Sequence, residues 1–137
     1  MTSGYFKMTN GKTDKIKLTQ SKKKPTDSYS YYQIYSYADI AYVGGGFGNP
    51  GVHNILEPAT FGVPIVIGPN YSHFEEATSL VQLGSCISIS NQQELEQALT
   101  DLIQNNDTRD HKGQICNAFV QKNKGATNRI MTKISTL

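Results

Sequence analysis

The stretch that decides the fold is GGGFGNPGVHNILEPATFGVPIVIGP, residues 44–69. A short apolar run, 40–43, leads into its three consecutive glycines, which is typical of a buried strand that enters a tight loop. Residues 54–61 have the pattern of a short helix that ends at Gly62, and residues 64–68 form a second apolar run. An unbroken apolar run suits a parallel strand that is covered on both faces. The stretch therefore predicts a strand, a glycine loop, a helix and a second strand.

The same alternation continues toward the C-terminus. The later elements expected in chain order are a helix over 73–83 closed by Gly84, a strand over 86–89, a helix over 92–104, a helix from about 107 to 122, a break at Gly125 and a last short helix. Asn91, with Glu94 three residues later, resembles a capping box at the start of one of these helices. Strands that alternate with helices predict an α/β fold, here a Rossmann-like open parallel sheet with helices on both faces. Ligands of such sheets bind at the carboxyl ends of the strands.

The N-terminal part of the chain is less informative. Residues 1–28 form a poorly patterned basic segment, and residues 29–137 are expected to form the α/β domain. Ile16 and Leu18 alternate with lysines, which is the pattern of a short strand. Tyrosines over 28–37 recur at helical spacing and suit a short helix whose apolar face is buried. A chain of 137 residues fits one domain and leaves little room for two.

Charge is distributed unevenly along the chain. Residues 1–37 hold seven Lys and two Asp and carry +5, whereas residues 38–137 carry −3. The densest basic run is Lys22 to Lys24, which would suit nonspecific contact with nucleic acid. A lysine run in a polar loop is more often simply solvated, so no nucleic-acid partner is expected.

Several classes of site and segment are not expected. Cys86 and Cys116 lie in apolar contexts without a CxxC pattern, which indicates two free buried thiols in a reducing compartment. No apolar run is long enough to span a membrane, and the N-terminus lacks the apolar region of a signal peptide. The three histidines lack metal-ligand spacing, and no pair of nucleophile and base is evident. Glu75 and Glu76 suit the first turn of a helix better than a catalytic dyad.

The glycine loop and the helix after it are the candidate binding site. Gly45 and Gly46 follow a strand and let a ligand approach the backbone closely. The loop enters a helix near His53 and Asn54, where free N–H groups and the helix dipole suit a phosphate. Glu57 lies one turn further, where its carboxylate would repel phosphate but would accept hydrogen bonds from ribose hydroxyls.

Simpler structural roles account for the same residues. Asn54 could be simply the cap of the helix, and Glu57 could simply compensate the helix dipole. His53 could be an ordinary loop histidine. Residues 70–73 form a second candidate, because they lead from a strand end into a helix, with Ser72 as a potential cap. The residues alone leave phosphate binding and a purely structural loop equally open.

A family resemblance narrows this choice. The segment ADIAYVGGGFGNPGVHNILEPATFGVPIVIGPNYSHFEEATSLVQLG, residues 38–84, resembles the C-terminal part of 3-deoxy-D-manno-octulosonic acid (Kdo) transferases. The GGGF, HNILEP, GVPIVIGPN and FEEA blocks follow the family pattern, most nearly in its Bacteroidetes form. The resemblance is specific from about residue 35 to residue 89, and it is poor before residue 28.

The resemblance implies a fold and a ligand. Family members have the two-domain GT-B fold of glycosyltransferases, and their C-terminal Rossmann-like domain binds the CMP part of the donor CMP-Kdo. The implied CMP contacts are Asn54, Ile55, Leu56 and Glu57, with Glu57 on the ribose, and no cofactor is expected besides this donor substrate. The family also has a Gly-x-Leu-type turn, which falls at 29–31 here. The glycine is absent there, and Ser30 is retained as a candidate contact.

Other implied parts of the parent enzyme are not found in this sequence. Family members carry an N-terminal domain with a membrane anchor, the site for the lipid A precursor and a catalytic glutamate. This chain is therefore expected to be a fragment, with no catalytic residue and no activity alone, and its truncated sheet could self-associate through an exposed edge. The parent would act at the cytoplasmic face of the bacterial inner membrane, with membrane contact only through that anchor, and the fragment would be soluble in the cytoplasm. The alternatives are a non-catalytic α/β module that binds an anion or a partner, or half of another GT-B nucleotide-sugar transferase.

Overall fold

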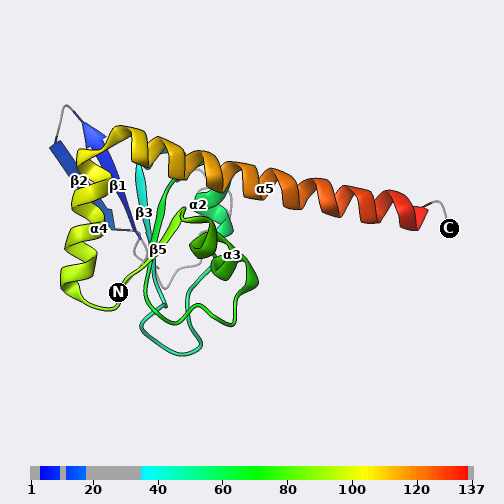
Figure 1. Cartoon of the computed structure of the whole chain (residues 1–137), viewed down its shortest axis with the longest axis horizontal. Helices are drawn as coiled ribbons and strands as arrows, with labels where there is room; N and C mark the ends of the chain where they lie inside the picture. Colours follow the sequence, from blue (N-terminus) through cyan, green and yellow to red (C-terminus); the bar gives the residue numbers. More distant parts are fainter. Residues whose placement is uncertain (1–3, 10–11, 18–34, 136–137) are drawn as a thin grey trace, which may run out of the picture.

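The computed structural model describes residues 4–9, 12–17 and 35–135. Its elements are β1 (Gly4–Thr9), β2 (Lys12–Lys17), the 3-10 helix η1 (Tyr35–Tyr37), β3 (Ile40–Val43), α2 (Leu56–Thr60), β4 (Ile65–Ile67), α3 (Glu75–Leu83), β5 (Cys86–Ser88), α4 (Gln92–Gln104) and α5 (Asn106–Ser135). The strands form one sheet in the order β2-β1-β3-β4-β5 (Figure 1). Strands β3, β4 and β5 pair in parallel, as the alternating pattern predicted.

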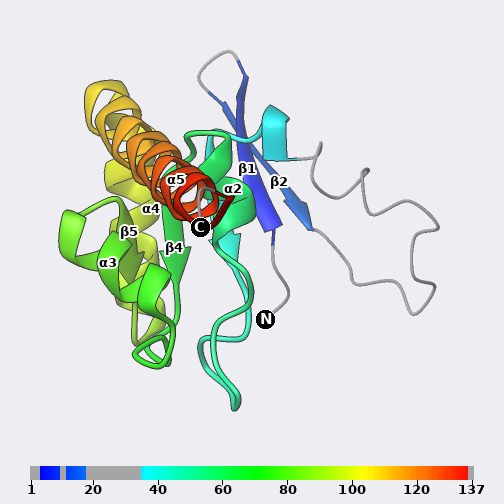
Figure 2. The same cartoon turned by 90° about the vertical axis from the view of Figure 1, so that its right-hand side faces the viewer.

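Helices cover both faces of the parallel strands. Every residue of β3 and of β4 is buried, which explains why neither strand alternates between apolar and polar residues. One face packs against α2, α3 and α5 through a core that includes Val43, Ile65 and Ile67 (Figure 2). The other face packs against α4, where Tyr42 and Val66 meet the apolar side of that helix. The predicted α/β architecture is confirmed.

The N-terminal segment adds a hairpin that the sequence pattern did not reveal. Strands β1 and β2 pair antiparallel, and β1 also pairs antiparallel with β3 through registers such as Tyr5 with Ala41. Ile16 lies in β2, as its alternation with lysines suggested, whereas Leu18 lies outside the described residues. The side of β3 away from β4 is thus paired, and self-association through an exposed sheet edge stays a prediction. The division of the chain at residue 28 stays a prediction.

Two helix ends match their sequence signals. Helix α3 ends at Gly84, whose φ of 85° is left-handed and therefore favours glycine. Helix α4 begins with the predicted capping box, since the Asn91 Oδ1 accepts a 2.9 Å hydrogen bond from the Glu94 backbone N–H. The Glu94 carboxylate in turn accepts a 2.6 Å bond from the Ser90 N–H, which also tightens the entry to the helix.

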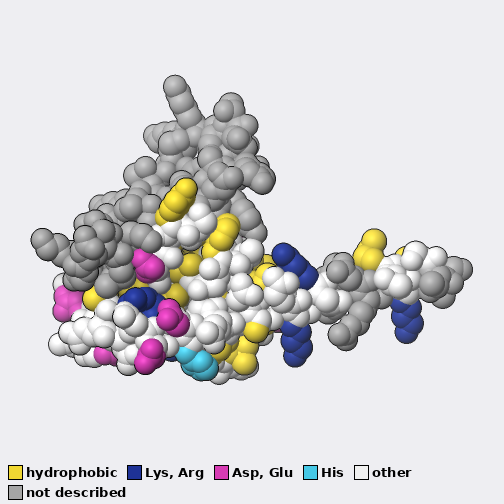
Figure 3. All heavy atoms as spheres, turned by 90° about the horizontal axis from the view of Figure 1, so that it is seen from above, with side chains coloured by type: hydrophobic (Ala, Val, Ile, Leu, Met, Phe, Trp, Pro, Cys, Tyr) yellow, Lys and Arg dark blue, Asp and Glu magenta, His cyan; other side chains and the backbone are white. Residues whose placement is uncertain are grey.

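Helix α5 differs from the prediction. It runs as one helix through Gly125, so the expected break there is wrong. A glycine keeps its backbone N–H and costs a helix only about 1 kcal/mol, which the surrounding helical residues outweigh. The distal part of α5 projects beyond the body (Figure 1), and Ile130, Met131 and Ile134 are exposed on it. In Figure 3 basic side chains lie along this projecting part, while the visible acidic ones lie over the body.

Two other helices are shorter than expected. Helix α2 covers Leu56–Thr60 rather than 54–61, because the segment before it folds as loop. Of the tyrosine-rich segment, η1 covers Tyr35–Tyr37, and the part before residue 35 lies outside the described residues. Tyr35 is buried, as the predicted burial of a tyrosine face requires. In the part of the chain that the structure describes, no helix is long and apolar enough to cross a membrane.

The two cysteines lie in the core between β5 and α5. Cys86 and Cys116 are both free and buried, as predicted. Burial is the main cause that raises the pKa of each thiol, and for Cys116 a hydrogen bond with the Ser85 side chain opposes the rise. Thiolates are the reactive form, so both groups should be inert in the folded protein.

We expect neither thiol to react with Ellman's reagent at pH 8 while the chain is folded. In guanidinium both thiols should react, because unfolding removes the burial that keeps them protonated and shielded. The measurement is the absorbance of the released aromatic thiolate before and after denaturant. A full reaction of one thiol within seconds in native buffer would show that the core around β5 and α5 is open.

Candidate functional site

The candidate site lies where β3 and β4 end side by side. Backbone hydrogen bonds join the loop after β3 to the turn after β4: the Asn70 N–H donates to the Gly46 carbonyl at 2.8 Å, and the Val52 N–H donates to the Asn70 carbonyl at 3.0 Å. A further bond of 2.9 Å, from the His53 N–H to the Gly44 carbonyl, closes the glycine loop on itself. These bonds hold the segment that enters α2 against the edge of the sheet.

The glycines of this loop are required by close backbone packing. A Cβ on Gly46 would lie 2.6 Å from the Gly68 nitrogen, and a Cβ on Gly68 would lie 2.5 Å from the Gly46 carbonyl carbon. Gly45 has a φ of 91°, and a Cβ there would meet the Gly51 carbonyl and the His53 ring. The loops thus fit against each other without side chains between them. Ligand contact by Gly45 and Gly46 stays a prediction, because this packing already explains both glycines.

The segment between the loop and α2 carries the predicted nucleotide contacts. The Asn54 Oδ1 accepts a 2.9 Å hydrogen bond from the Leu56 N–H, so Asn54 does serve the start of the helix. This bond occupies one of the N–H groups that were predicted to bind a phosphate. Helix α2 has five residues, and its dipole contributes correspondingly little to anion binding. Both observations reduce what the N-terminus of α2 alone can contribute to anion binding.

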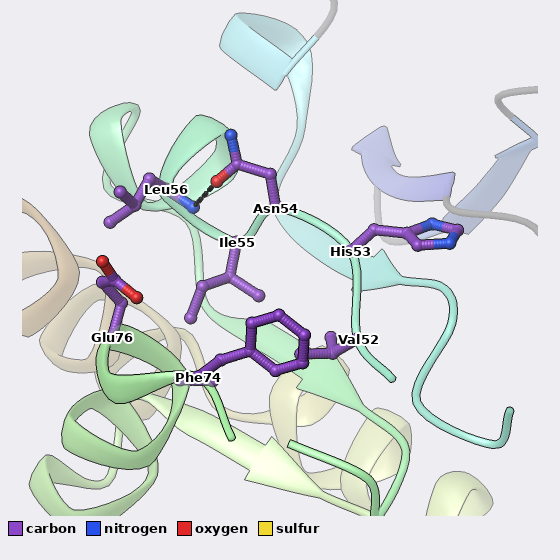
Figure 4. A pocket seen from close by; sticks show the side chains of 8 residues that line it. Val52, His53, Asn54, Ile55, Leu56, Phe74 and Glu76 are labelled. Carbon is purple, nitrogen blue, oxygen red and sulfur yellow. Dashed lines mark hydrogen bonds between the residues drawn. The ribbon is translucent and has the colours of Figure 1, made fainter. Parts of the chain in front are cut away.

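A cavity of about 280 Å³ lies between this segment and the start of α3. Its lining residues are Val52, His53, Asn54, Ile55, Leu56, Phe74, Glu76 and Ala77. The Phe74 ring lies against Ile55, and the Glu76 carboxylate points toward Leu56 (Figure 4). The structure thus brings four of the predicted site residues, His53 to Leu56, together with Phe74, Glu76 and Ala77 at the start of α3.

Glu57 lies on the other side of the start of α2. It is half-buried and is not among the residues that line the cavity. The pKa of Tyr35 is raised to about 12, mainly by burial and further by the negative charge of Glu57. Helix α2 packs beside η1, and an effect of the Glu57 charge on Tyr35 agrees with a carboxylate on the η1 side of α2. The entry to α2 therefore has two polar groups on two sides, Glu57 toward η1 and Glu76 toward α3.

Sequence reasoning missed Phe74 and Glu76 as site residues. The pattern gave Glu76 only a role in the first turn of a helix. The available signal was the candidate at 70–73, because the carboxyl ends of neighbouring parallel strands meet at one edge of the sheet. Ser72, proposed as a cap there, makes no cap bond, since α3 begins after Phe74 without a side-chain cap.

Other predicted features fall outside the site. Ser30 lies outside the described residues. Over residues 4–9, 12–17 and 35–135, no three His, Cys, Asp or Glu side chains gather as metal ligands would.

Comparison with known proteins points to one family. The chain is 30% identical over 100 residues to the 3-deoxy-D-manno-octulosonic acid transferase of Haemophilus influenzae, a match that covers 72% of this chain and 23% of the relative. It is 40% identical over 93 residues to the enzyme of the same name from Chlamydia trachomatis, covering 66% of this chain and 20% of the relative. The chain thus matches about a fifth of the length of these curated relatives. No family model matches the chain.

A solved structure shares the fold. The C-terminal CMP-Kdo binding domain of WaaA from Acinetobacter baumannii superposes with a TM-score of 0.58 at 21% sequence identity. The match covers 71% of this chain and 51% of that domain's chain. By its sequence the chain belongs to the 3-deoxy-D-manno-octulosonic acid transferase family, and it has the α/β fold of the C-terminal domain of those enzymes.

Proposed function

We propose that this chain binds the donor CMP-Kdo for a transferase that attaches Kdo to a lipid A precursor. The observation that carries the proposal is the His53–Leu56 segment, which lies beside a cavity at the carboxyl edge of the parallel strands. Nucleotides bind at this edge in open α/β sheets. The relatives are named as Kdo transferases, and the solved WaaA domain with this fold is a CMP-Kdo binding domain.

The proposed contacts divide between the phosphate and the ribose. The backbone of Asn54 to Leu56 faces the phosphate, where the N–H groups other than that of Leu56, which donates to Asn54, donate hydrogen bonds. Glu57 accepts hydrogen bonds from the two ribose hydroxyls, a role for which a half-buried carboxylate is well suited. The nearby buried Tyr35 limits the water that competes for this carboxylate.

We assign no residue of this chain to the chemical step. Glu75 and Glu76 are exposed to solvent, whereas a carboxyl group that acts as a general acid or base is usually held in a more buried setting. Transfer to the lipid acceptor, at the cytoplasmic face of the inner membrane, is proposed for the family's whole enzyme. This chain contributes donor binding.

Calorimetric titration of the full chain with CMP, UDP and ADP tests the proposal. We expect CMP to bind more tightly than the other two, because the family's donor is a CMP sugar. Tighter binding of UDP would assign the chain to another nucleotide-sugar transferase family. Indifference to all three nucleotides, together with concentration-dependent dimerisation in sedimentation, would support a non-catalytic module instead.

A further inference from the structure

The cavity beside the His53–Leu56 segment has a composition that does not suit a phosphate. Its walls are mainly apolar, formed by Val52, Ile55 and Ala77, and its charged group is the Glu76 carboxylate. Among the described residues, no lysine or arginine lines it. A carboxylate repels a phosphate and accepts hydrogen bonds from hydroxyl groups, so the ligand that fits here has an apolar surface and hydroxyl donors.

Phe74 provides a fixed aromatic wall. Its N–H donates a 2.9 Å hydrogen bond to the Tyr71 carbonyl, and its partly buried side chain packs against the core that includes Ile55 and Ala77. The Phe74 ring also lies directly against Gly51, where an added Cβ would be 2.9 Å from its Cε2 atom. A half-buried ring held in this way can pack against the C–H face of a sugar ring with little loss of side-chain entropy.

The two sides of the α2 entry match the order of groups in a nucleotide sugar. Glu57, the proposed ribose ligand, lies toward η1, whereas Phe74 and Glu76 lie toward α3. Figure 4 shows the Phe74 and Glu76 side chains facing the His53–Leu56 segment from the α3 side of the cavity. A phosphate at the segment between them would have the nucleoside on the η1 side and the transferred sugar on the α3 side.

From this arrangement we propose that the cavity takes the hydroxyl-bearing part of the transferred sugar. Glu76 accepts hydrogen bonds from its hydroxyls, and Phe74 packs against its apolar face. This inference rests on the proposed donor-binding function and makes Glu76 a residue that determines specificity for the sugar rather than for the nucleotide. It predicts that the wild-type chain binds CMP-Kdo more tightly than CMP.

Glu75 provides a matched control for a test of Glu76. Both residues are exposed acids in the first turn of α3, so each alanine variant changes charge and helix dipole equally. Of the two, only Glu76 lines the cavity. Calorimetry with CMP and with CMP-Kdo on the full chain, the Glu76→Ala variant and the Glu75→Ala variant separates the sugar contribution from the nucleotide contribution.

We expect Glu76→Ala to weaken CMP-Kdo binding about tenfold and to leave CMP binding within about twofold, since hydrogen bonds to charged groups are strong. Glu75→Ala should change neither affinity, and both variants should melt at the same temperature. If the wild-type chain binds neither ligand, the proposed function itself is wrong. If both ligands bind but Glu76→Ala behaves like Glu75→Ala, the sugar assignment is wrong while donor binding stands. If Glu76→Ala weakens CMP as much as CMP-Kdo, the cavity holds part of the nucleotide and the assignment is again wrong.

Discussion

Replacing Gly113 by alanine should lower the free energy of unfolding by about 3 kcal/mol, the upper range for overpacking a core. Gly113 is buried in α5, where the helix crosses the turn that ends α2. An added Cβ would overlap the Gly62 carbonyl group. Gly62 has a φ of 66°, so its backbone is already in a restricted turn and cannot shift without moving α2. Urea unfolding followed by circular dichroism measures the loss.

Gly125 is the matched control in the same helix. A Cβ there would meet nothing within 4 Å, so Gly125→Ala adds a methyl group without a clash. Alanine is the better helix former, and this variant should gain roughly 0.5–1 kcal/mol in stability. Similar changes in the free energy of unfolding of the two variants would mean that helix propensity, rather than contact with α2, determines how an added methyl group in α5 changes stability.

The parts of the fold that the sequence predicted are those with a local physical cause. Strands β3 and β4 are continuous apolar runs because both of their faces are buried. Helices α3 and α4 carry their own stop and start signals, the left-handed Gly84 and the Asn91 cap. Where the local signal was weak, the prediction was incomplete. Strand β2 is half lysine, and what defines the β1–β2 hairpin is pairing with β3, a contact distant in sequence.

The site shows the same division between local and distant causes. The approach of His53–Leu56 to the sheet edge follows from a strand, a loop and a helix that are adjacent in sequence. The position of Phe74 and Ile55 in one cavity depends instead on how the segments after two different strands lie beside each other, which no local pattern encodes. The glycines illustrate a further limit. Their sequence pattern suits a loop that binds a ligand and a loop that packs tightly on another backbone segment equally well. In the structure a Cβ on Gly46 would lie 2.6 Å from the Gly68 nitrogen, so close backbone packing is by itself a sufficient reason for glycine at this position.

Replacing Glu57 by glutamine should weaken CMP binding by about 10- to 100-fold. Glutamine keeps the shape of the side chain but loses the charge that strengthens hydrogen bonds from the ribose hydroxyls, worth about 1.5–3 kcal/mol. The half-buried position of Glu57, beside buried Tyr35, makes these bonds less exposed to competing water than a surface carboxylate would be. Helix stability should change little, because Glu57 lies in a five-residue helix that is held mainly by the core contacts of Pro58 and Ala59.

A second ligand, 2′-deoxy-CMP, distinguishes loss of a contact with the ribose from a general effect of removing a negative charge. The wild-type chain should prefer CMP to 2′-deoxy-CMP by roughly tenfold, the effect of one charge-assisted hydrogen bond, and Glu57→Gln should lose most of that preference. Glu75→Gln removes an equal charge from the same edge of the domain and should keep the preference intact. The combination of the two ligands and two variants forms a thermodynamic cycle whose coupling energy belongs to the contact between Glu57 and the 2′-hydroxyl. If Glu57→Gln weakens both ligands equally, the carboxylate acts on the nucleotide through helix α2 and not through the ribose.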